Sequence, residues 1–380
     1  MLSENNLKIT NFLIIPRPHI GDFIWATSAA ALLKKFDKTA EITVIVPENL
    51  KEFIIGNFIF DETYYYNLNF FESQNIFTKI FYRLFLFMKS VILLRKKKFD
   101  ACFLFNPFTL FIKISAFLKI KDFIFSAYEC CGYAKTSKEL SILKKFKPAE
   151  KLFPIETPKD ADRVHRSYIY QMLVRKYLNF PAASLPVLPE TGNDYAKIEA
   201  PIKTKKLKKI AICMQPSKSS KNVWPLEYFA ETINEISKRF SAAFFVVGSN
   251  EDENKTFKPL LDKMDKNTEI KNLMGQTSLL ELKDFLGKCD LLISVDTGTM
   301  HVAATTKTNI ISLFGMTHPD SVIPMTPRNM SLYAGAECSP CIYKLSFEKY
   351  KCPYGNNPKC MEMIKPEDVI KCAVKILEQK

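Results

Sequence analysis

Short apolar runs that alternate with stretches of helical periodicity constrain the fold of this chain more than any other feature of its sequence. Residues 11–16 form a continuous apolar run, which is typical of a strand buried on both faces of a parallel sheet. Apolar side chains then recur at helical spacing over 22–36, and a second apolar run follows at 40–46. This strand–helix–strand unit predicts a parallel sheet flanked by helices.

The same alternation continues and starts again after a Pro-rich break that opens at residue 181. Further strands are predicted at 99–105, 123–127, 209–214, 242–247, 291–295 and 310–314, and further helices at 227–240, 279–287 and 300–305. Because 380 residues are long for one domain, we predict two. The predicted fold class is α/β, with two Rossmann-like, doubly wound parallel-sheet domains, 1–185 and 207–380, that are joined by a linker at 186–206 and face a cleft.

The composition indicates a globular, basic protein, with 47% hydrophobic residues and a formal net charge of +14. The N-terminus does not resemble a signal peptide, and the most apolar stretch, 81–94, is interrupted by Arg83 and Lys89. We therefore expect a cytoplasmic protein, in which clustered cysteines indicate metal binding or catalysis rather than disulfides. A solvated basic surface explains this charge as well as a binding partner does. The possible partners are an anionic membrane surface, a phosphorylated substrate or nucleic acid, and no nucleic-acid recognition motif is found.

The strongest local motif begins where the strand at 291–295 ends. Its residues are Asp296, Thr297, Gly298, Thr299, Met300 and His301. A helix is expected to begin within this motif, so that free backbone N–H groups and the positive end of the helix dipole meet there. Gly298 lets an anion approach the main chain, and the two threonines add hydroxyl donors. The motif predicts a diphosphate site, with an ordinary helix cap as the alternative.

A second motif, R-P-H-I-G-D at 17–22, lies between the first strand and the first helix. Gly21 is expected to permit a tight turn, and Asp22 falls where the helix starts, facing the cleft. A carboxylate there could act as the general base that deprotonates an acceptor hydroxyl. Capping of the helix by Asp22 is the alternative.

A third motif runs from Lys218 to Pro225, after the first strand of the second half. Lys218 or Lys221 could neutralise a leaving diphosphate, as metal ions do in other transferases. A solvated loop lysine is the alternative for either residue. Pro225 is typical of the first turn of a helix.

Four cysteines lie within residues 338–360, in a segment that also carries prolines and a glycine. They are Cys338, Cys341, Cys352 and Cys360. Their spacing fits one tetrahedral site, and both zinc and iron accept four thiolates. Such a site would be structural, because the cysteines fill all four ligand positions. Four reduced cysteines without a metal are the alternative.

Between residues 77 and 121 aromatic and aliphatic residues are interspersed with lysines and arginines. A basic amphipathic surface of this kind can rest on anionic lipid. Helices packed in the core with their lysines outward are the alternative.

Together these motifs resemble glycosyltransferase family 9, the ADP-heptose:lipopolysaccharide heptosyltransferases and their relatives. The similar motifs are R-x-x-x-G-D at 17–22, a K-x-W-P-like segment at 221–225, G-x-T-S-L at 275–279 and D-T-G-x-x-H at 296–301 with L-F-G at 313–315. Two features depart from the family pattern. The segment at 221–225 has one extra residue, which leaves Lys218 and Lys221 as alternatives for the phosphate contact. Met316 and His318 replace residues common after F-G, which leaves the donor sugar open.

The resemblance implies a GT-B fold and an inverting transfer of a heptose from ADP-heptose to a lipopolysaccharide or lipooligosaccharide core acceptor, without a required cofactor. Asp22 would be the catalytic base in an acceptor-binding N-terminal domain, beside Arg17 and Gly21. The C-terminal domain would bind the nucleotide sugar. There the resemblance implies Thr297, Gly298, Thr299 and Met300 at the diphosphate, Asp296 near the sugar, Glu251 at the ribose, Thr277 beside the adenine and His301 at a matching position.

Three other functions compete with this one. The four cysteines resemble the iron-binding finger of the branch that modifies autotransporter adhesins, which makes a protein heptosyltransferase the first alternative. A catalytically silent scaffold and a nucleotide-sugar epimerase are the others. An anionic glycolipid acceptor would also imply peripheral contact with the inner face of the inner membrane.

Overall fold

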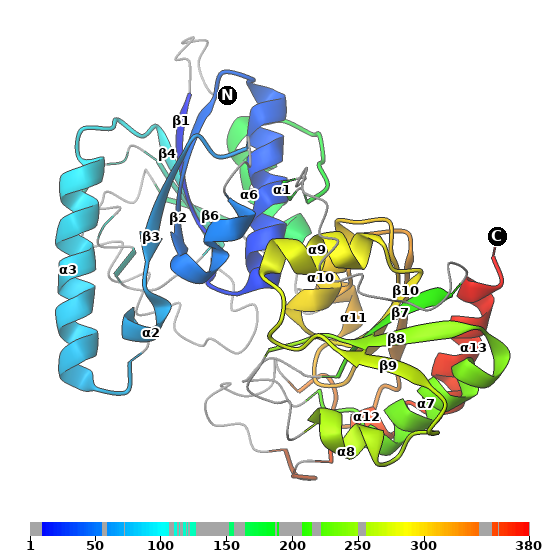
Figure 1. The fold of residues 1–380 in the computed structure, drawn as a ribbon. Coiled ribbons are helices and arrows are strands. Elements are labelled where there is room, and N and C mark those ends of the chain that lie inside the picture. The colour runs from blue at the N-terminus through cyan, green and yellow to red at the C-terminus, as the bar shows by residue number, and fades with distance from the viewer. Residues whose placement is uncertain are drawn as a thin grey trace. The chain divides into compact units, whose positions relative to one another are not determined.

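The fold is shown in Figure 1 as a computed structural model. The structure describes residues 10–54, 59–71, 73–105, 110–111, 114, 117–118, 120, 122–126, 152–155, 164–186, 188–189, 207–214, 222–249, 256–341, 352–355 and 357–379. These form two compact units. The first holds the described residues through Pro189 except Val164 and His165, which belong to the second unit with the residues from 207 onward. Most of the linker predicted at 186–206 lies outside the described residues.

The first unit is built on a parallel sheet. Among the described residues its strands are β1 (Asn11–Ile15), β2 (Glu41–Pro47), β3 (Glu62–Tyr66), β4 (Ala101–Leu104), β5 (Asp122–Ser126) and β6 (Leu152–Ile155). Their order in space is β3-β2-β1-β4-β5-β6. The order reverses between β1 and β4, and such a switch point is where parallel α/β sheets bind ligands, at the carboxyl ends of the strands.

Helices cover both faces of this sheet. They are α1 (Ile20–Phe36), the 3₁₀ helix η1 (Glu48–Phe53), α2 (Leu68–Phe71), α3 (Ile76–Leu94) and α6 (Arg166–Leu178). Leu86 and Leu94 of α3 pack with Leu13 and Ile15 of β1 in one core cluster. In Figure 1 α1 and α6 lie on the opposite side of the sheet from α3. None of the described helices is long and apolar enough to cross a membrane.

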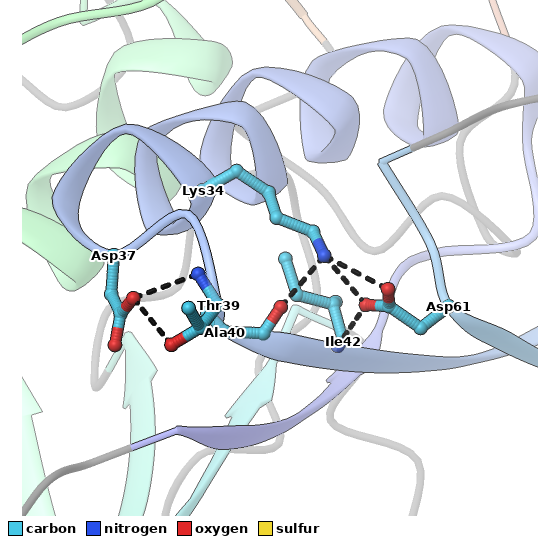
Figure 2. Close-up of polar contacts among 6 residues, drawn as sticks. All are labelled: Lys34, Asp37, Thr39, Ala40, Ile42 and Asp61. Carbon is cyan, nitrogen blue, oxygen red and sulfur yellow. Dashed lines mark hydrogen bonds and ion pairs between the residues drawn. The ribbon is translucent and has the colours of Figure 1, made fainter.

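The connection from α1 to β2 is fixed by two carboxylates (Figure 2). Asp61, just before β3, accepts two hydrogen bonds from Lys34 of α1, at 2.9 and 2.8 Å, and one from the backbone N–H of Ile42 at 2.7 Å. In the turn itself, Asp37 accepts from the backbone and the hydroxyl of Thr39. The contacts tie the end of α1 to the edge of the sheet and so hold the helix whose first turn carries Asp22.

The second unit repeats the arrangement of the first. Its described strands are β7 (Lys208–Cys213), β8 (Ala242–Val246), β9 (Glu269–Asn272), β10 (Leu291–Val295), β11 (Asn309–Phe314) and β12 (Asn329–Tyr333). All neighbours pair in parallel, in the order β12-β11-β10-β7-β8-β9, so the switch point lies between β7 and β10. Its helices are α7 (Leu226–Arg239), α8 (Lys258–Leu261), α9 (Leu279–Gly287), α10 (Gly298–Ala304), α11 (Pro319–Val322), α12 (Lys359–Glu362) and α13 (Pro366–Leu377).

The C-terminal segment completes the core of this second unit. Trp224 is 1% exposed, and its indole N–H donates to the carbonyl of Ile364 at 2.9 Å. Met361 and Val369 lie in the same core cluster as Phe229 of α7. The last two helices are therefore part of the fold that holds α7 and the strands, rather than an appendage to it.

Candidate functional site

Asp22 lies in the first turn of α1, where the chain leaves β1. Its side chain is 4% exposed, and its Oδ1 accepts a hydrogen bond from the hydroxyl of Tyr170 at 2.9 Å. The Tyr170 ring stacks on Phe105, which directly follows β4, with ring centroids 4.1 Å apart. The residues beyond both strands of the switch point therefore meet around Asp22. The N-cap of α1 is His19, so the capping alternative for Asp22 is wrong.

The tight turn expected at Gly21 is not at that position. Gly21 is buried inside α1, because the first helical hydrogen bond already joins the Phe23 N–H to the His19 carbonyl at 2.9 Å. The chain bends at residues 18–19 instead. The prediction of a turn at Gly21 was wrong because the helix begins two residues earlier than its apolar spacing indicates.

The surroundings of Asp22 favour its ionised form. Burial raises the pKa of this carboxyl, but the charges of Arg17, Arg166 and His19 and the hydrogen bond from Tyr170 outweigh burial and leave the pKa below its ordinary value. Burial and the neighbouring carboxylate raise the pKa of Tyr170 well above its usual range, so the phenol keeps the proton that it donates. Asp22 is therefore a carboxylate at neutral pH.

Helix α6 supplies two of these groups from one face. Arg166 and Tyr170 are four residues apart, which is the spacing of neighbours along a helix. A buried polar cluster holds α6 against α1: Ser28 Oγ lies 2.9 Å from Ser167 Oγ, and the Gln171 amide donates to both hydroxyls at 3.3 and 3.2 Å. These hydrogen bonds hold α6 against α1 and so fix the position of Tyr170 relative to Asp22.

Asp296 follows β10 directly, and two side chains that donate hydrogen bonds to it are described. Its Oδ2 accepts from the Thr317 hydroxyl at 2.6 Å and from the Asn222 amide at 3.2 Å. Asn222 is 1% exposed, and its own Oδ1 accepts from the backbone N–H groups of Gly315 and Met316 at 3.2 and 2.8 Å. One amide side chain therefore joins the carboxylate after β10 to the turn after β11.

The helix predicted after Asp296 forms as α10, which begins at Gly298. Thr297 occupies the N-cap position, but its side chain makes no capping hydrogen bond. Capping by the threonine side chain, one form of the alternative to a diphosphate site, is therefore wrong. Thr299 lies in the first turn, and its hydroxyl is 3.5 Å from the sulfur of Cys213 at the end of β7. The helix start is thus at the switch point between β7 and β10, where the diphosphate was predicted.

Met300 and His301 point into the second unit. Met300 is fully buried and His301 is 4% exposed. Because it is fully buried, the side chain of Met300 belongs to the core of the second unit. Its backbone N–H donates to the Thr297 carbonyl at 3.2 Å.

Thr277 lies in a loop that is pinned at the end of β8. Gly275, with a φ of +67°, donates its N–H to the Gly248 carbonyl at 2.9 Å, a conformation that favours glycine. Ser278 then caps α9 in a reciprocal arrangement with Glu281. Thr277 is held between these two fixed points. The predicted Lys218, Lys221 and Glu251 lie outside the described residues.

The four cysteines of the predicted metal loop are all described. Burial raises the pKa of Cys360 to about 12, and the charges of Cys338, Cys341 and Cys352 add to the effect, which indicates that the four lie in one region. Among the residues with described side chains, however, no three histidine, cysteine, aspartate or glutamate groups are placed to hold a metal ion. The metal site predicted at these four cysteines therefore stays a prediction.

The cysteine loop packs on the turn that Asn222 holds. The Cys341 N–H donates to the Met316 carbonyl at 3.1 Å. A Cβ atom on Gly315 would lie 2.9 Å from the Cys360 sulfur and 2.6 Å from the Met361 sulfur, closer than real Cβ atoms come to their neighbours. The loop therefore touches the backbone next to the donors of the Asp296 network.

Four residues of these two networks were missed by the sequence analysis: Tyr170, Arg166, Asn222 and Thr317. The i, i+4 spacing of the first two on a helix was an available signal. Asn222 is within the segment whose extra residue departs from the family pattern, but nothing in the sequence indicates that it bonds to residues 74 and more positions away.

Comparison with known proteins places these features in a wider group. The model of glycosyltransferase family 9 (heptosyltransferase) matches residues 116–351, more than half of the chain. The chain is 31% identical to lipooligosaccharide heptosyltransferase 2 of Campylobacter jejuni over 158 residues, which are 41% of this chain and 46% of the relative. The chain thus spans about half the length of the curated relatives that it matches.

Two solved structures are similar over nearly the whole chain. A glycosyltransferase family 9 protein from Veillonella parvula has a TM-score of 0.74 at 18% identity, covering 98% of this chain and 99% of its own. The Escherichia coli ADP-heptose lipopolysaccharide heptosyltransferase II has a TM-score of 0.71 at 16% identity, covering 97% and 99%. At such identities the likeness shows the fold, and with the two parallel sheets it confirms the predicted α/β fold of the GT-B type.

Proposed function

This chain belongs to glycosyltransferase family 9, and we propose that it transfers a heptose from ADP-heptose, with inversion, to the core of a lipopolysaccharide or lipooligosaccharide. The observation that carries the proposal is Asp22, a buried carboxylate kept ionised chiefly by Arg17 and Arg166 and oriented by Tyr170. A general base has to be unprotonated and fixed in place before the acceptor arrives. Asp22 meets both requirements.

In the proposed reaction Asp22 accepts the proton of an acceptor hydroxyl. The oxygen attacks the anomeric carbon from the face opposite the diphosphate, a new carbon–oxygen bond forms, and the bond from that carbon to the diphosphate oxygen breaks. ADP leaves with the bonding electron pair. The N–H groups at the start of α10 can stabilise the negative charge that develops on the leaving group.

The second unit is proposed to hold the donor. Asp296 would accept a hydrogen bond from the sugar, and Thr297, Gly298 and Thr299 would line the diphosphate. The fixed network of Asn222 and Thr317 supports this role, because a carboxylate that is already oriented loses little freedom when a ligand binds. Thr277 beside the adenine, Glu251 at the ribose, and Lys218 or Lys221 at the phosphates complete the proposed donor site.

A glycolipid acceptor is preferred over an adhesin. The curated relatives are named as lipooligosaccharide or lipopolysaccharide heptosyltransferases, which supports the first acceptor. No observation on the described residues favours a protein acceptor. The cytoplasmic location expected from the sequence stays a prediction that fits this proposal.

A structural metal in the cysteine loop also stays a prediction. Elemental analysis of the purified protein by mass spectrometry would test it, with the Cys341→Ser/Cys360→Ser variant as the control. Zinc or iron near one equivalent in the wild type and absent from the variant supports the metal. No metal in either protein supports four reduced thiols. The transfer itself is proposed to need no cofactor.

The experiment that tests the function is a mass-spectrometric transfer assay with ADP-heptose. The acceptors are a truncated core glycolipid and a serine-rich adhesin fragment, each with wild type and Asp22→Asn. Heptose on the glycolipid that is lost in the variant is expected. Heptose only on the fragment would move the adhesin function to first place, sugar isomerisation without acceptor would indicate an epimerase, and no ADP release with any acceptor would overturn the donor.

A further inference from the structure

Helix α3 of the first unit displays a wide apolar face to the outside. Phe77 is 82% exposed and Phe81 is 76% exposed. The large apolar side chains exposed on this helix are Ile76, Phe77, Ile80, Phe81, Leu84, Phe85, Met88, Ile92 and Leu93. Figure 1 shows α3 outermost in its unit, with the sheet on one side only. Soluble proteins rarely leave so continuous an apolar surface without a binding partner.

The exposed apolar side chains form one continuous stripe along the helix. Phe77, Phe81, Leu84, Met88 and Ile92 follow one another at intervals of four, three, four and four residues, which places them on one side of a helix. The opposite side is anchored in the core, where Leu86, Ser90 and Leu94 are buried. The helix therefore has two apolar sides, and the first unit needs only one of them.

Aromatic residues outside α3 extend the same surface. Phe70 of α2 is 50% exposed and lies 5.5 Å from Tyr82, measured between ring centroids. Phe117 is 63% exposed and packs edge-on against Phe87 at 5.3 Å. The surface formed by α3 with Phe70 and Phe117 is called the α3 surface below.

The charge of this segment has one sign. No aspartate or glutamate occurs between residues 73 and 99, whereas the basic residues there are Lys79, Arg83, Lys89, Arg95, Lys96, Lys97 and Lys98. Lys97 pairs with Glu62. Lys89, Arg95, Lys96 and Lys98 are exposed, the last three directly after the helix. Long basic side chains at the border of an apolar face can extend to phosphate groups while their stems cover lipid chains.

We infer that the α3 surface is a docking site for an anionic phospholipid bilayer, with α3 lying along the interface and its outer side chains inserted among the acyl chains. The same charge pattern disfavours a second copy of the chain as the partner, because pairing two α3 surfaces would bring two all-basic segments together. An anionic bilayer supplies both the apolar layer and the opposite charge. This inference goes beyond the proposed transfer and does not depend on the identity of the donor.

Flotation with vesicles tests the inference. The full chain is mixed with vesicles of phosphatidylethanolamine and phosphatidylglycerol, or of phosphatidylcholine alone. We expect binding to the anionic vesicles only. The Phe77→Ser/Phe81→Ser variant should lower that binding roughly tenfold or more, because two large apolar side chains no longer insert. The matched control is Leu185→Ser, which removes a 65% exposed apolar side chain outside the α3 surface and should change nothing.

Two further measurements separate the outcomes. Lys96→Glu/Lys98→Glu should weaken binding to anionic vesicles by about thirtyfold or more, since each basic residue near the surface contributes separately. Phe81→Trp should give fluorescence that is quenched by acyl-brominated lipid, against a background of Trp25 and Trp224, which are 3% and 1% exposed.

Equal flotation of wild type and the double serine variant, with both proteins folded by circular dichroism, would overturn the inference. A lipid-free dimer that the same variant dissociates would overturn it in favour of a second copy. Transfer to a soluble truncated acceptor should be the same in wild type and the serine variant. Failure of transfer in both proteins would count against the proposed function and leave the vesicle result standing.

Discussion

The two carboxylates at the switch points of this molecule, Asp22 and Asp296, have different described neighbours. Asp22 is buried among Arg17, Arg166 and His19 and accepts from a phenol. Asp296 accepts from an amide and a hydroxyl, both neutral. Guanidinium groups beside a carboxylate favour its ionised form, and a hydrogen-bond donor favours that form as well while it fixes the direction of the oxygen. The difference fits the proposal that Asp22 accepts a proton and that Asp296 holds a polar ligand.

Replacement of the carboxylate that is held by cations should have the largest effect. Asp22→Asn keeps the shape of the side chain and removes the proton acceptor, so kcat should fall by about a thousandfold. ADP affinity, measured by calorimetry, should stay within about twofold, because the donor is proposed to bind the second unit. Loss of ADP affinity with unchanged kcat would reverse the roles given to the two units.

Removal of the amide that orients Asp296 should come next. Asn222→Ala leaves the buried N–H groups of Gly315 and Met316 without their acceptor, and each unsatisfied group costs about 1–3 kcal/mol. We expect a free energy of unfolding lowered by about 2 kcal/mol and a KM for the donor raised about tenfold, with kcat less affected. Val223→Ala, at a neighbouring side chain that is 40% exposed, is the control and should change neither quantity.

The phenol beside Asp22 should have a smaller effect that is visible in the pH profile. Because Tyr170 favours the ionised carboxylate, Tyr170→Phe should raise the pKa of Asp22 toward its ordinary value. The base must be unprotonated, so the acid limb of kcat/KM against pH should move to higher pH.

The same sign applies to stability. A lowered pKa in the folded state means that ionised Asp22 contributes stability above its unfolded pKa, and that this stability is lost as pH falls through the folded pKa.

Tyr177→Phe is the matched control for the pH profile of Tyr170→Phe, since Tyr177 donates to Asp122 at 2.8 Å in the same unit. If both variants shift the acid limb equally, Tyr170 has no special relation to the base.

The smallest effect is expected for the ion pair between Lys34 and the exposed carboxylate of Asp61, which has only a structural role. Lys34→Met removes the partner of Asp61, whose side chain is 40% exposed, and should lower the free energy of unfolding by about 1 kcal/mol or less. Transfer should be unchanged, as measured by kcat/KM at neutral pH. A large loss of activity would show that the α1–β2 connection controls the position of Asp22 more tightly than its hydrogen bonds indicate.

The sequence predicted the centre of each sheet better than its edges. The helix at 279–287 and the strand at 291–295 match α9 and β10 residue for residue. The strands that were not predicted, β3, β6, β9 and β12, are the edge strands of the two sheets. Central parallel strands are buried on both faces and so read as apolar runs, whereas an edge strand such as EIKN in β9 is half exposed and polar. The apolar-run criterion cannot find it.

A similar division applies to the candidate site. Asp22, Asp296 and the start of α10 could be predicted, because each lies within a few residues of a strand end that the sequence reveals. Tyr170 and Asn222 could not, since they reach the two carboxylates from 148 and 74 residues away. Motifs specify which groups lie at the end of a strand, and tertiary packing decides which distant side chains orient them.

The close packing of Gly315 has a consequence for the order in which the protein is made. Gly315 donates to Asn222 on one side and lies against Cys360 and Met361 on the other. During synthesis the segment that carries Cys360 leaves the ribosome some 45 residues after Gly315, and Ile364, whose carbonyl accepts from Trp224, follows that residue by 140 positions. Until then the turn beside Asp296 lacks the side chains of Cys360 and Met361 that pack against it. The nascent chain can thus complete its first sheet well before the turn beside Asp296 in the second unit is fully packed.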